Sequence, residues 1–257
     1  MKKIVYTVLK WTGITLLFLL AFGYLLLANR LVQQQERQVF CNKIDIEIAD
    51  SALTRLVIPQ DLHRFFNQQN IHLTGSKMFY LNTYGLEQLI SKESGVKQCQ
   101  VYNRINGVVT ISLSQRVPLL RVEAPHAAYY IDDSGVLFPS VPNRTAYVPV
   151  VSGNIPLHNT EWMDKLYQLG SYIHSHRFWN AQVEQLHVHE PNNIELIQRA
   201  GTQTTVLMGD LSQFEYKLQK LYTFYRTVAA TQGWDKYTSI DIRYGDQIVC
   251  RQKSIKP

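Results

Sequence analysis

One uncharged segment constrains this chain more than any other feature. Residues 11–29 read WTGITLLFLLAFGYLLLAN and contain no Asp, Glu, Lys or Arg. As a helix, these 19 residues would extend about 28 Å, close to the roughly 30 Å hydrocarbon core of a bilayer. Three lysines precede the segment, and a basic tail favours the cytoplasmic side. The sequence therefore predicts a cytoplasmic tail over 1–10, a transmembrane helix over 11–29, and a large part outside the inner membrane.

The alternative to a membrane anchor is a cleaved signal peptide. The apolar core of a signal peptide is usually about 7–15 residues long and ends at an A-x-A-like site. Here the apolar run is longer, and Ala28 has Leu26 two places before it, which matches that site poorly. The sequence favours an uncleaved, single-pass anchor.

The part beyond this segment is nearly neutral. The chain has a formal net charge of +6, but its first thirty residues hold four of the 26 basic and none of the 20 acidic side chains. That leaves 22 basic against 20 acidic side chains, a net charge of +2, with no basic tract. Binding of nucleic acid requires a clustered basic face, so the composition argues against it. About 225 residues suffice for one large or two small domains.

The first unit after the membrane segment is expected over residues 43–116, beyond a polar, Gln-rich stalk over 30–42. Its apolar periodicity predicts the order strand, helix, helix, strand, strand. The first strand is KIDIEIA, the first helix begins at Pro59, and Asn106-Gly107 predicts a tight turn between the last two strands. The expected core consists of Leu62, Phe65, Leu89, Val101, Ile111 and Leu113.

The second unit is expected over residues 117–257 and reads mostly as strands with two helices laid against them. The helices are predicted over 162–174 and from about 211 to Gly233, where apolar residues recur every three or four positions. The predicted strands are 127–132, 136–140, 183–189, 194–198, 204–208, 238–244 and 247–253. Together the two units predict an α+β protein whose second domain is mostly antiparallel.

The order of the first unit resembles a POTRA module. The stretch VKQCQVYNRINGVVTISLSQRVPLL is similar to that module's final strand, turn and strand, and Arg116-Val117-Pro118 stands at its charged corner. In the second unit, YYIDDSGVLFP, VPVVSGNIP and SIDIRYGDQIVCR resemble the β domain of FtsQ/DivIB cell-division proteins. The resemblance covers nearly the whole chain. Gln115, which replaces an acidic residue, and the Cys-rich, Gly-poor final strand depart from the family pattern.

The terminal strands are the strongest candidate for a binding site. A strand near the chain end can form a sheet edge, whose unpaired N–H and C=O groups template a partner strand. Ile240 and Ile242 alternate with Asp241 and Arg243, which buries one face and exposes the other. Natural edges are also protected by charge, so the residues alone support a partner site and a blocked edge equally.

The family resemblance favours the partner site. It implies a non-enzymatic inner-membrane scaffold, enriched at the division septum, whose β domain binds FtsB/DivIC-like and FtsL-like single-span proteins in the periplasm. It implies no cofactor, no metal, no nucleic acid and no small-molecule substrate. Arg243 and Tyr244 lie on the matching Asp-x-Arg-Tyr motif and are assigned to the partner site, and Asp246, Gln247 and Ile248 are added because they are adjacent.

Motifs of enzymes are scarce. The sequence lacks G-x-S-x-G, H-E-x-x-H and GxxxxGK[ST]. Residues 94–97 read S-x-x-K, but Gly95 ends a helix, Val96 enters a strand and no partner motif follows, so a chance match is favoured. The chain is expected not to be an enzyme. The alternatives that stay open are a POTRA scaffold for secretion or envelope assembly and a membrane-anchored envelope hydrolase.

Three smaller clusters have an ordinary structural explanation. His187 and His189 share one face of a strand and could ligate a metal with Glu184 or Glu190, although solvent-facing strand residues are favoured. The adjacent carboxylates Asp132-Asp133 are expected to start a turn. The cysteines Cys41, Cys99 and Cys250 are far apart. One pair could join in an oxidising compartment, but three separate thiols are favoured.

Overall fold

The computed structural model describes residues 11, 13, 16–30, 39–49, 55–104, 106–200, 204–233 and 236–253. Residues 16–30 are helical. Within the described ranges, no helix combines the length and the apolar character that crossing a membrane requires. The predicted tail over 1–10 lies outside the described residues, as do parts of the predicted segment 11–29 and of the stalk 30–42. The chain divides into two compact units, which are considered separately.

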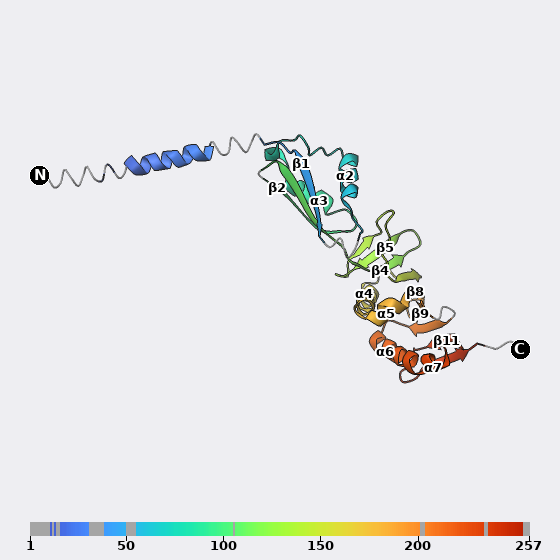
Figure 1. The fold of residues 1–257 in the computed structure, drawn as a ribbon. Coiled ribbons are helices and arrows are strands. Elements are labelled where there is room, and N and C mark those ends of the chain that lie inside the picture. Colours follow the sequence, from blue (N-terminus) through green and yellow to red (C-terminus); the bar gives the residue numbers. More distant parts are fainter. Residues whose placement is uncertain are drawn as a thin grey trace. The chain divides into compact units, whose positions relative to one another are not determined.

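The first unit is a three-stranded sheet with two helices (Figure 1). Its strands follow the order β1-β3-β2, and β1 runs parallel to β3 from Lys43 opposite Val108 to Ala49 opposite Ser114. The predicted order strand, helix, helix, strand, strand is confirmed. The elements are β1 (Lys43–Ala49), α2 (Pro59–Gln68), the 3₁₀ turn η1 (Met78–Tyr80), α3 (Thr83–Ile90), β2 (Val96–Arg104) and β3 (Val108–Gln115).

Local chemistry explains the boundaries of these elements. Pro59 occupies the first turn of α2, where no N–H is needed, and Asp61 accepts a hydrogen bond from the N–H of Ile58 at 3.0 Å. Asn82 caps α3 by accepting from the N–H of Gly85 at 2.8 Å. Gly107 has a φ of +80° between β2 and β3, which confirms the predicted turn.

For two residues of the first unit, the prediction that they belong to the core is wrong. Phe65 is only half-buried and Leu89 is 40% exposed, whereas their neighbours Phe66 and Ile90 are 4% and 0% exposed. On α2 the inward face carries Leu62 and Phe66, which are four positions apart. Phe65, one position before Phe66, therefore lies toward the side of the helix. The same spacing on α3 places Leu86 and Ile90 inside. The other predicted core residues, Leu62, Val101, Ile111 and Leu113, are buried.

The second unit is a nine-stranded sheet in the order β12-β11-β10-β9-β8-β7-β4-β5-β6. β7 runs parallel to both β4 and β8, β10 runs parallel to β11, and the remaining neighbours are antiparallel. Its strands are β4 (Pro118–Glu123), β5 (Ala128–Asp132), β6 (Leu137–Pro139), β7 (Val150–Gly153), β8 (Val183–Glu190), β9 (Asn193–Gln198), β10 (Thr205–Gly209), β11 (Tyr237–Asp241) and β12 (Val249–Gln252).

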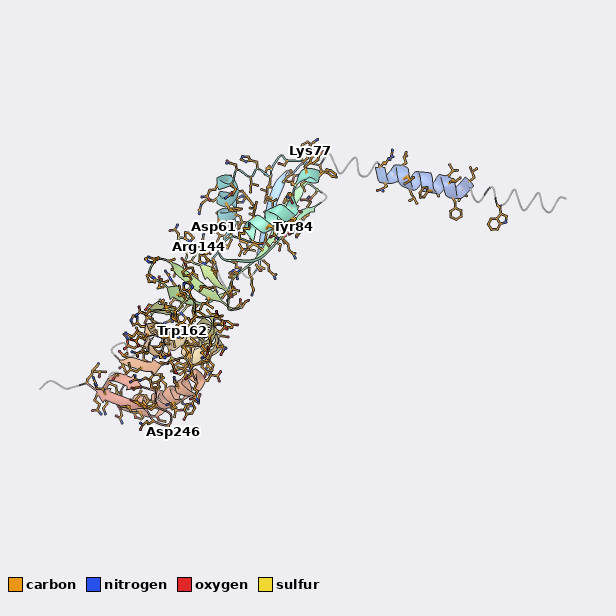
Figure 2. All side chains as sticks on the ribbon, turned by 180° about the vertical axis from the view of Figure 1, so that it is seen from behind. Asp61, Lys77, Tyr84, Arg144, Trp162 and Asp246 are labelled. Carbon is orange, nitrogen blue, oxygen red and sulfur yellow. The ribbon has the colours of Figure 1, made fainter. Side chains whose placement is uncertain are left out.

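The helices of this unit share one hydrophobic core with the sheet. They are α4 (Thr160–Ser175), α5 (Arg177–Gln182), α6 (Phe214–Phe224) and the π-helical turn η2 (Tyr225–Ala229). The short α7 (Ala230–Gln232) follows η2 and has no buried residue. Figure 2 places Trp162, at the start of α4, in the densely packed part of the unit. The predicted inward face of α4, namely Trp162, Leu166, Leu169 and Ile173, is buried in one core with residues of β4, β8 and β9, and α4 lies against β4.

Three elements of the second unit escaped the sequence patterns. β7 has four residues, too few for a strand period to show. β4 begins with three successive buried residues, Pro118, Leu119 and Leu120, and this apolar start hides the alternation of Leu120 and Val122 with Arg121 and Glu123. α5 has six residues, too few for a helical period to show. The expectation of two helices is therefore wrong, because α5 is a third. The strands outnumber the helices as predicted.

Candidate functional site

The final strand β12 forms one edge of the nine-stranded sheet. Among the described strands only β11 pairs with it, antiparallel, from Tyr237 opposite Gln252 to Asp241 opposite Val249. The N–H of Lys253 donates to the carbonyl of Lys236 at 3.0 Å, so position 253 faces inward. In an antiparallel ladder, inward and outward positions alternate along a strand. The main-chain groups of positions 250 and 252 therefore face the open side.

The two faces of β12 differ in character. Ile248 and Cys250 pack partly against the hydrophobic core, whereas Val249 is 48% exposed. Arg251 and Gln252 are also exposed. An added strand would thus find main-chain donors and acceptors along the edge and an exposed apolar side chain beside them. This is the arrangement that β-augmentation uses.

The predicted partner residues lie in the connection between β11 and β12, outside both strands. Arg243, Tyr244, Asp246 and Gln247 are exposed, and Ile248 is half-buried. The predicted strands 238–244 and 247–253 are therefore shorter in the structure, ending at Asp241 and beginning at Val249. β11 ends at Asp241 because its carboxylate accepts the N–H of Arg243 at 3.1 Å, which turns the backbone away from the ladder.

The Asp-x-Arg part of the motif is an ion pair that shapes this connection. Arg243 donates from Nε and Nη2 to the two carboxylate oxygens of Asp241, at 2.9 and 2.6 Å. Asp241 is 8% exposed, and these hydrogen bonds from Arg243 hold the pKa of its carboxyl below the ordinary value of 3.8. Gly209 permits this placement, because a Cβ there would come within 2.9 Å of Cγ of Arg243.

A lysine on α6 holds the rest of the connection. The ammonium group of Lys220 donates to the carbonyl oxygens of Ile242 at 3.3 Å, Gln247 at 3.4 Å and Tyr244. Burial lowers the pKa of Lys220 from its ordinary value. One turn earlier, the hydroxyl of Tyr216 donates to Oδ1 of Asp246 at 3.0 Å. The exposed connection is therefore tied to α6 at both ends of its bend. Lys220 and Tyr216 gave no signal in the sequence.

The S-x-x-K fragment does not form a catalytic pair. The hydroxyl of Ser94 donates to the carbonyl of Pro139 at 2.5 Å, and the ammonium of Lys97 pairs with Asp133 at 2.9 Å. Each side chain therefore has a partner of its own. Asp132 is fully buried and accepts from the N–H groups of Ser134 and Val136, both at 2.9 Å. The prediction that the Asp132-Asp133 pair starts a turn is confirmed.

The two histidines of β8 lie side by side, with ring centroids 4.6 Å apart. Nδ1 of His187 lies 2.9 Å from the hydroxyl of Ser152, and Nε2 of His189 lies 3.1 Å from a carboxylate oxygen of Glu195. Glu195, from β9, was not among the sequence candidates. In the part of the chain that the structure describes, no group of three or more metal-ligating side chains is suitably placed.

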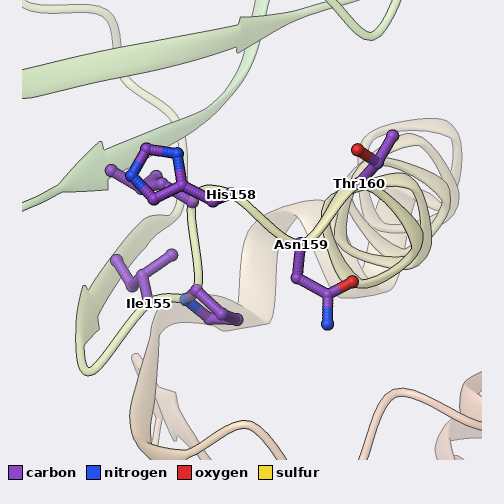
Figure 3. A pocket seen from close by; sticks show the side chains of 6 residues that line it. Ile155, His158, Asn159 and Thr160 are labelled. Carbon is purple, nitrogen blue, oxygen red and sulfur yellow. The ribbon is translucent and has the colours of Figure 1, made fainter.

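Two remaining features have structural roles. Cys41 is buried, Cys99 and Cys250 are half-buried, and all three are free thiols. A shallow cavity lies at the loop between β7 and α4, lined by residues 155–160 (Figure 3). Its lining residues are one continuous stretch, from this loop into the first residue of α4. Asn159 caps α4 there, because its side chain accepts the N–H of Trp162 at 3.1 Å.

Comparison with known families assigns both units. Residues 117–251 match a family described as FtsQ/DivIB, C-terminal related, and residues 39–114 match the POTRA-like domain. The first match includes the connection before β12 and β12 itself as far as Arg251. No curated protein matches the chain.

Proposed function

The chain belongs to the FtsQ/DivIB family, and on this premise we propose that it is a single-pass inner-membrane scaffold of the bacterial division machinery. FtsQ/DivIB and POTRA domains are non-catalytic scaffold domains. The proposed protein has a cytoplasmic N-terminus, places both units in the periplasm, and recruits FtsB/DivIC-like and FtsL-like partners to the septum. A secretion scaffold would explain the POTRA-like match but not the match over the second unit.

The open edge of β12 is the observation that carries this proposal. A non-enzymatic scaffold needs a surface that selects a partner, and an unpaired strand edge offers a row of main-chain donors and acceptors. Beside it stands a connection held by Lys220 and by the pair of Asp241 and Arg243. A connection ordered before binding loses less conformational entropy when the partner docks.

We assign two roles within this surface. The outward main-chain groups of positions 250 and 252 pair with a strand of the FtsB/DivIC-like partner. The exposed side chains of Tyr244 and Val249 contact that strand and set its register, since each is 48% exposed.

The decisive experiment removes one outward donor and nothing else. Proline at position 252 deletes the N–H and is tolerated where that group faces away from the ladder. The full chain carrying Gln252→Pro should capture about tenfold less FtsB/DivIC-like partner from membranes, as expected for about 1.4 kcal/mol. Gln252→Ala is the matched control, because it also removes the side chain but keeps the N–H, and it should capture as much as the natural chain.

Two further measurements distinguish loss of the outward N–H from unfolding of the sheet. The thermal unfolding of Gln252→Pro should stay close to that of Gln252→Ala, which shows that the sheet is intact. Arg251→Pro should instead destabilise the hairpin, since position 251 faces β11. If Gln252→Pro captures the partner as well as the control, then β12 is not the binding edge.

A further inference from the structure

An exposed aromatic patch stands at the N-terminal end of the first unit. It consists of Phe40, Phe79 and Tyr80, which are 52%, 54% and 75% exposed, together with the exposed Lys77. The rings of Phe79 and Tyr80 lie 5.3 Å apart, edge to face, and the ammonium of Lys77 lies 5.9 Å from the ring centre of Phe40. Scattered exposed aromatics are ordinary, but a contiguous group marks a contact surface.

The backbone holds these side chains outward. Phe40 and Lys77 face each other in an antiparallel bridge, which the bond from the N–H of Met78 to the carbonyl of Val39, at 2.9 Å, reinforces. Cys41 and Met78 anchor the two short segments in the core, at 1% and 6% exposure. Strand residues alternate in direction, so anchoring Cys41 and Met78 leaves Phe40 and Lys77 facing solvent. Phe79 and Tyr80 follow Met78 in the 3₁₀ turn η1, where both are exposed. The patch is thus built into the unit.

Charge and chain length limit what can cover the patch. Lys43 pairs with Asp45 at 3.9 Å, whereas Lys77 lies in a segment, 71–82, that contains no Asp or Glu, so the surface around Lys77 suits an anionic partner. Only residues 31–38 separate Phe40's segment from the apolar helix 16–30. Nine residue steps reach at most about 32 Å, so the patch stays near any bilayer that this helix enters.

We propose that this patch docks onto the membrane interface, with its aromatic rings at the level of the lipid headgroups and Lys77 on lipid phosphates. Aromatic rings are enriched at this depth because one end is apolar and the other tolerates water, and lysines there contact anionic lipid. Docking would fix the orientation of the first unit on the bilayer. The inference rests on the proposed membrane anchor and concerns a surface separate from the β12 edge.

Photocrosslinking to lipid tests the inference on the full chain. The photoreactive amino acid p-benzoylphenylalanine replaces Tyr80 in protein reconstituted into bilayers of phosphatidylethanolamine and phosphatidylglycerol, and lipid adducts are measured by peptide mass. Tyr84 is the matched control, because it is 68% exposed on the same unit but lies away from Lys77 and the aromatic patch (Figure 2). Position 80 should form clearly more lipid adduct than position 84, because an aromatic side chain at the level of the headgroups contacts lipid.

Other arms separate this inference from the anchor and from other occupants. The same photoreactive group at Phe22, in the apolar helix, reports the anchor alone. If position 22 forms lipid adducts but positions 80 and 84 form them in equal yield, the docking inference is overturned and the membrane anchor stands. If position 22 forms no lipid adduct, the anchor and the docking inference are both overturned. In whole cells, adducts at 80 that join protein instead of lipid would also overturn it. The Phe79→Ser, Tyr80→Ser double variant should lose protection of residues 76–81 from hydrogen exchange in bilayers, yet still capture the FtsB/DivIC-like partner.

Discussion

Arg243 donates two hydrogen bonds to the carboxylate of Asp241, from Nε at 2.9 Å and from Nη2 at 2.6 Å. The two residues are separated by Ile242 alone, whose N–H donates to the carbonyl of Leu207 on β10 at 3.1 Å. The pair therefore forms where the chain leaves the sheet. It converts a strand end into the rigid start of the exposed connection that we assign to partner binding.

This pair predicts an acid-sensitive domain. The pKa of Asp241 is held below 3.8 mainly by its hydrogen bond to Arg243. A lowered carboxyl pKa stabilises the folded state above the ordinary value, and this stabilisation is lost as the pH falls through the lowered value. Asp241→Asn should cost about 1–2 kcal/mol at neutral pH. Its unfolding free energy should also depend less on pH below about 4 than that of the natural chain. Parallel acid titrations of the two proteins would contradict the assignment.

Lys220 is predicted to hold the partner-binding connection in place. Lys220→Met keeps most of the apolar stem but leaves three carbonyl groups without their donor. We expect Lys220→Met to lower the free energy of unfolding by about 1–3 kcal/mol. We also expect this variant to capture less partner than the control variant does. The control is Lys165→Met on α4, whose ammonium makes only an exposed pair with Glu161 at 2.7 Å. Equal partner capture by both variants would remove the role of Lys220.

Tyr244 is predicted to be an aromatic anchor for the partner. Its side chain is 48% exposed beside the open edge, and central aromatic residues carry much of the energy of protein interfaces. Tyr244→Ala should weaken binding of the FtsB/DivIC-like partner by about 1–3 kcal/mol, measured by titration calorimetry. Tyr147→Ala, which removes a tyrosine that is 83% exposed elsewhere on the unit, should leave the affinity unchanged. Identical affinities for the two variants would place the hot spot elsewhere.

The core of the first unit is predicted to depend on Phe66 rather than Phe65. Phe66 is 4% exposed, so Phe66→Ala leaves a cavity and should cost about 3–5 kcal/mol. Phe65 is half-buried, and Phe65→Ala should cost less than half as much. Urea unfolding of the two full-length variants measures this difference directly. A unit of this size has little stability in reserve, so Phe66→Ala should also abolish septal localisation.

Local patterns predicted the elements whose signals are local. The alternation in KIDIEIA, the proline that opens α2 and the Asn-Gly turn before β3 each act within a few residues, and the structure confirms all three. β4 escaped prediction because its first three residues, Pro118, Leu119 and Leu120, are all buried, which breaks the alternation at its start. Phe65 and Phe66 are adjacent, so the sequence alone could not decide which of them enters the core.

The sequence by itself determined the two-unit organisation, the family and the segment in which the candidate site lies, because motif order and apolar periodicity are written along the chain. Only the tertiary structure decided that β12 is a sheet edge, which follows from pairings between distant strands. It also decided that Lys220, more than twenty residues before the connection, holds the carbonyls of Ile242 and Gln247. Such contacts depend on where separate elements meet in space, and a spacing of this length leaves no periodic trace in the sequence.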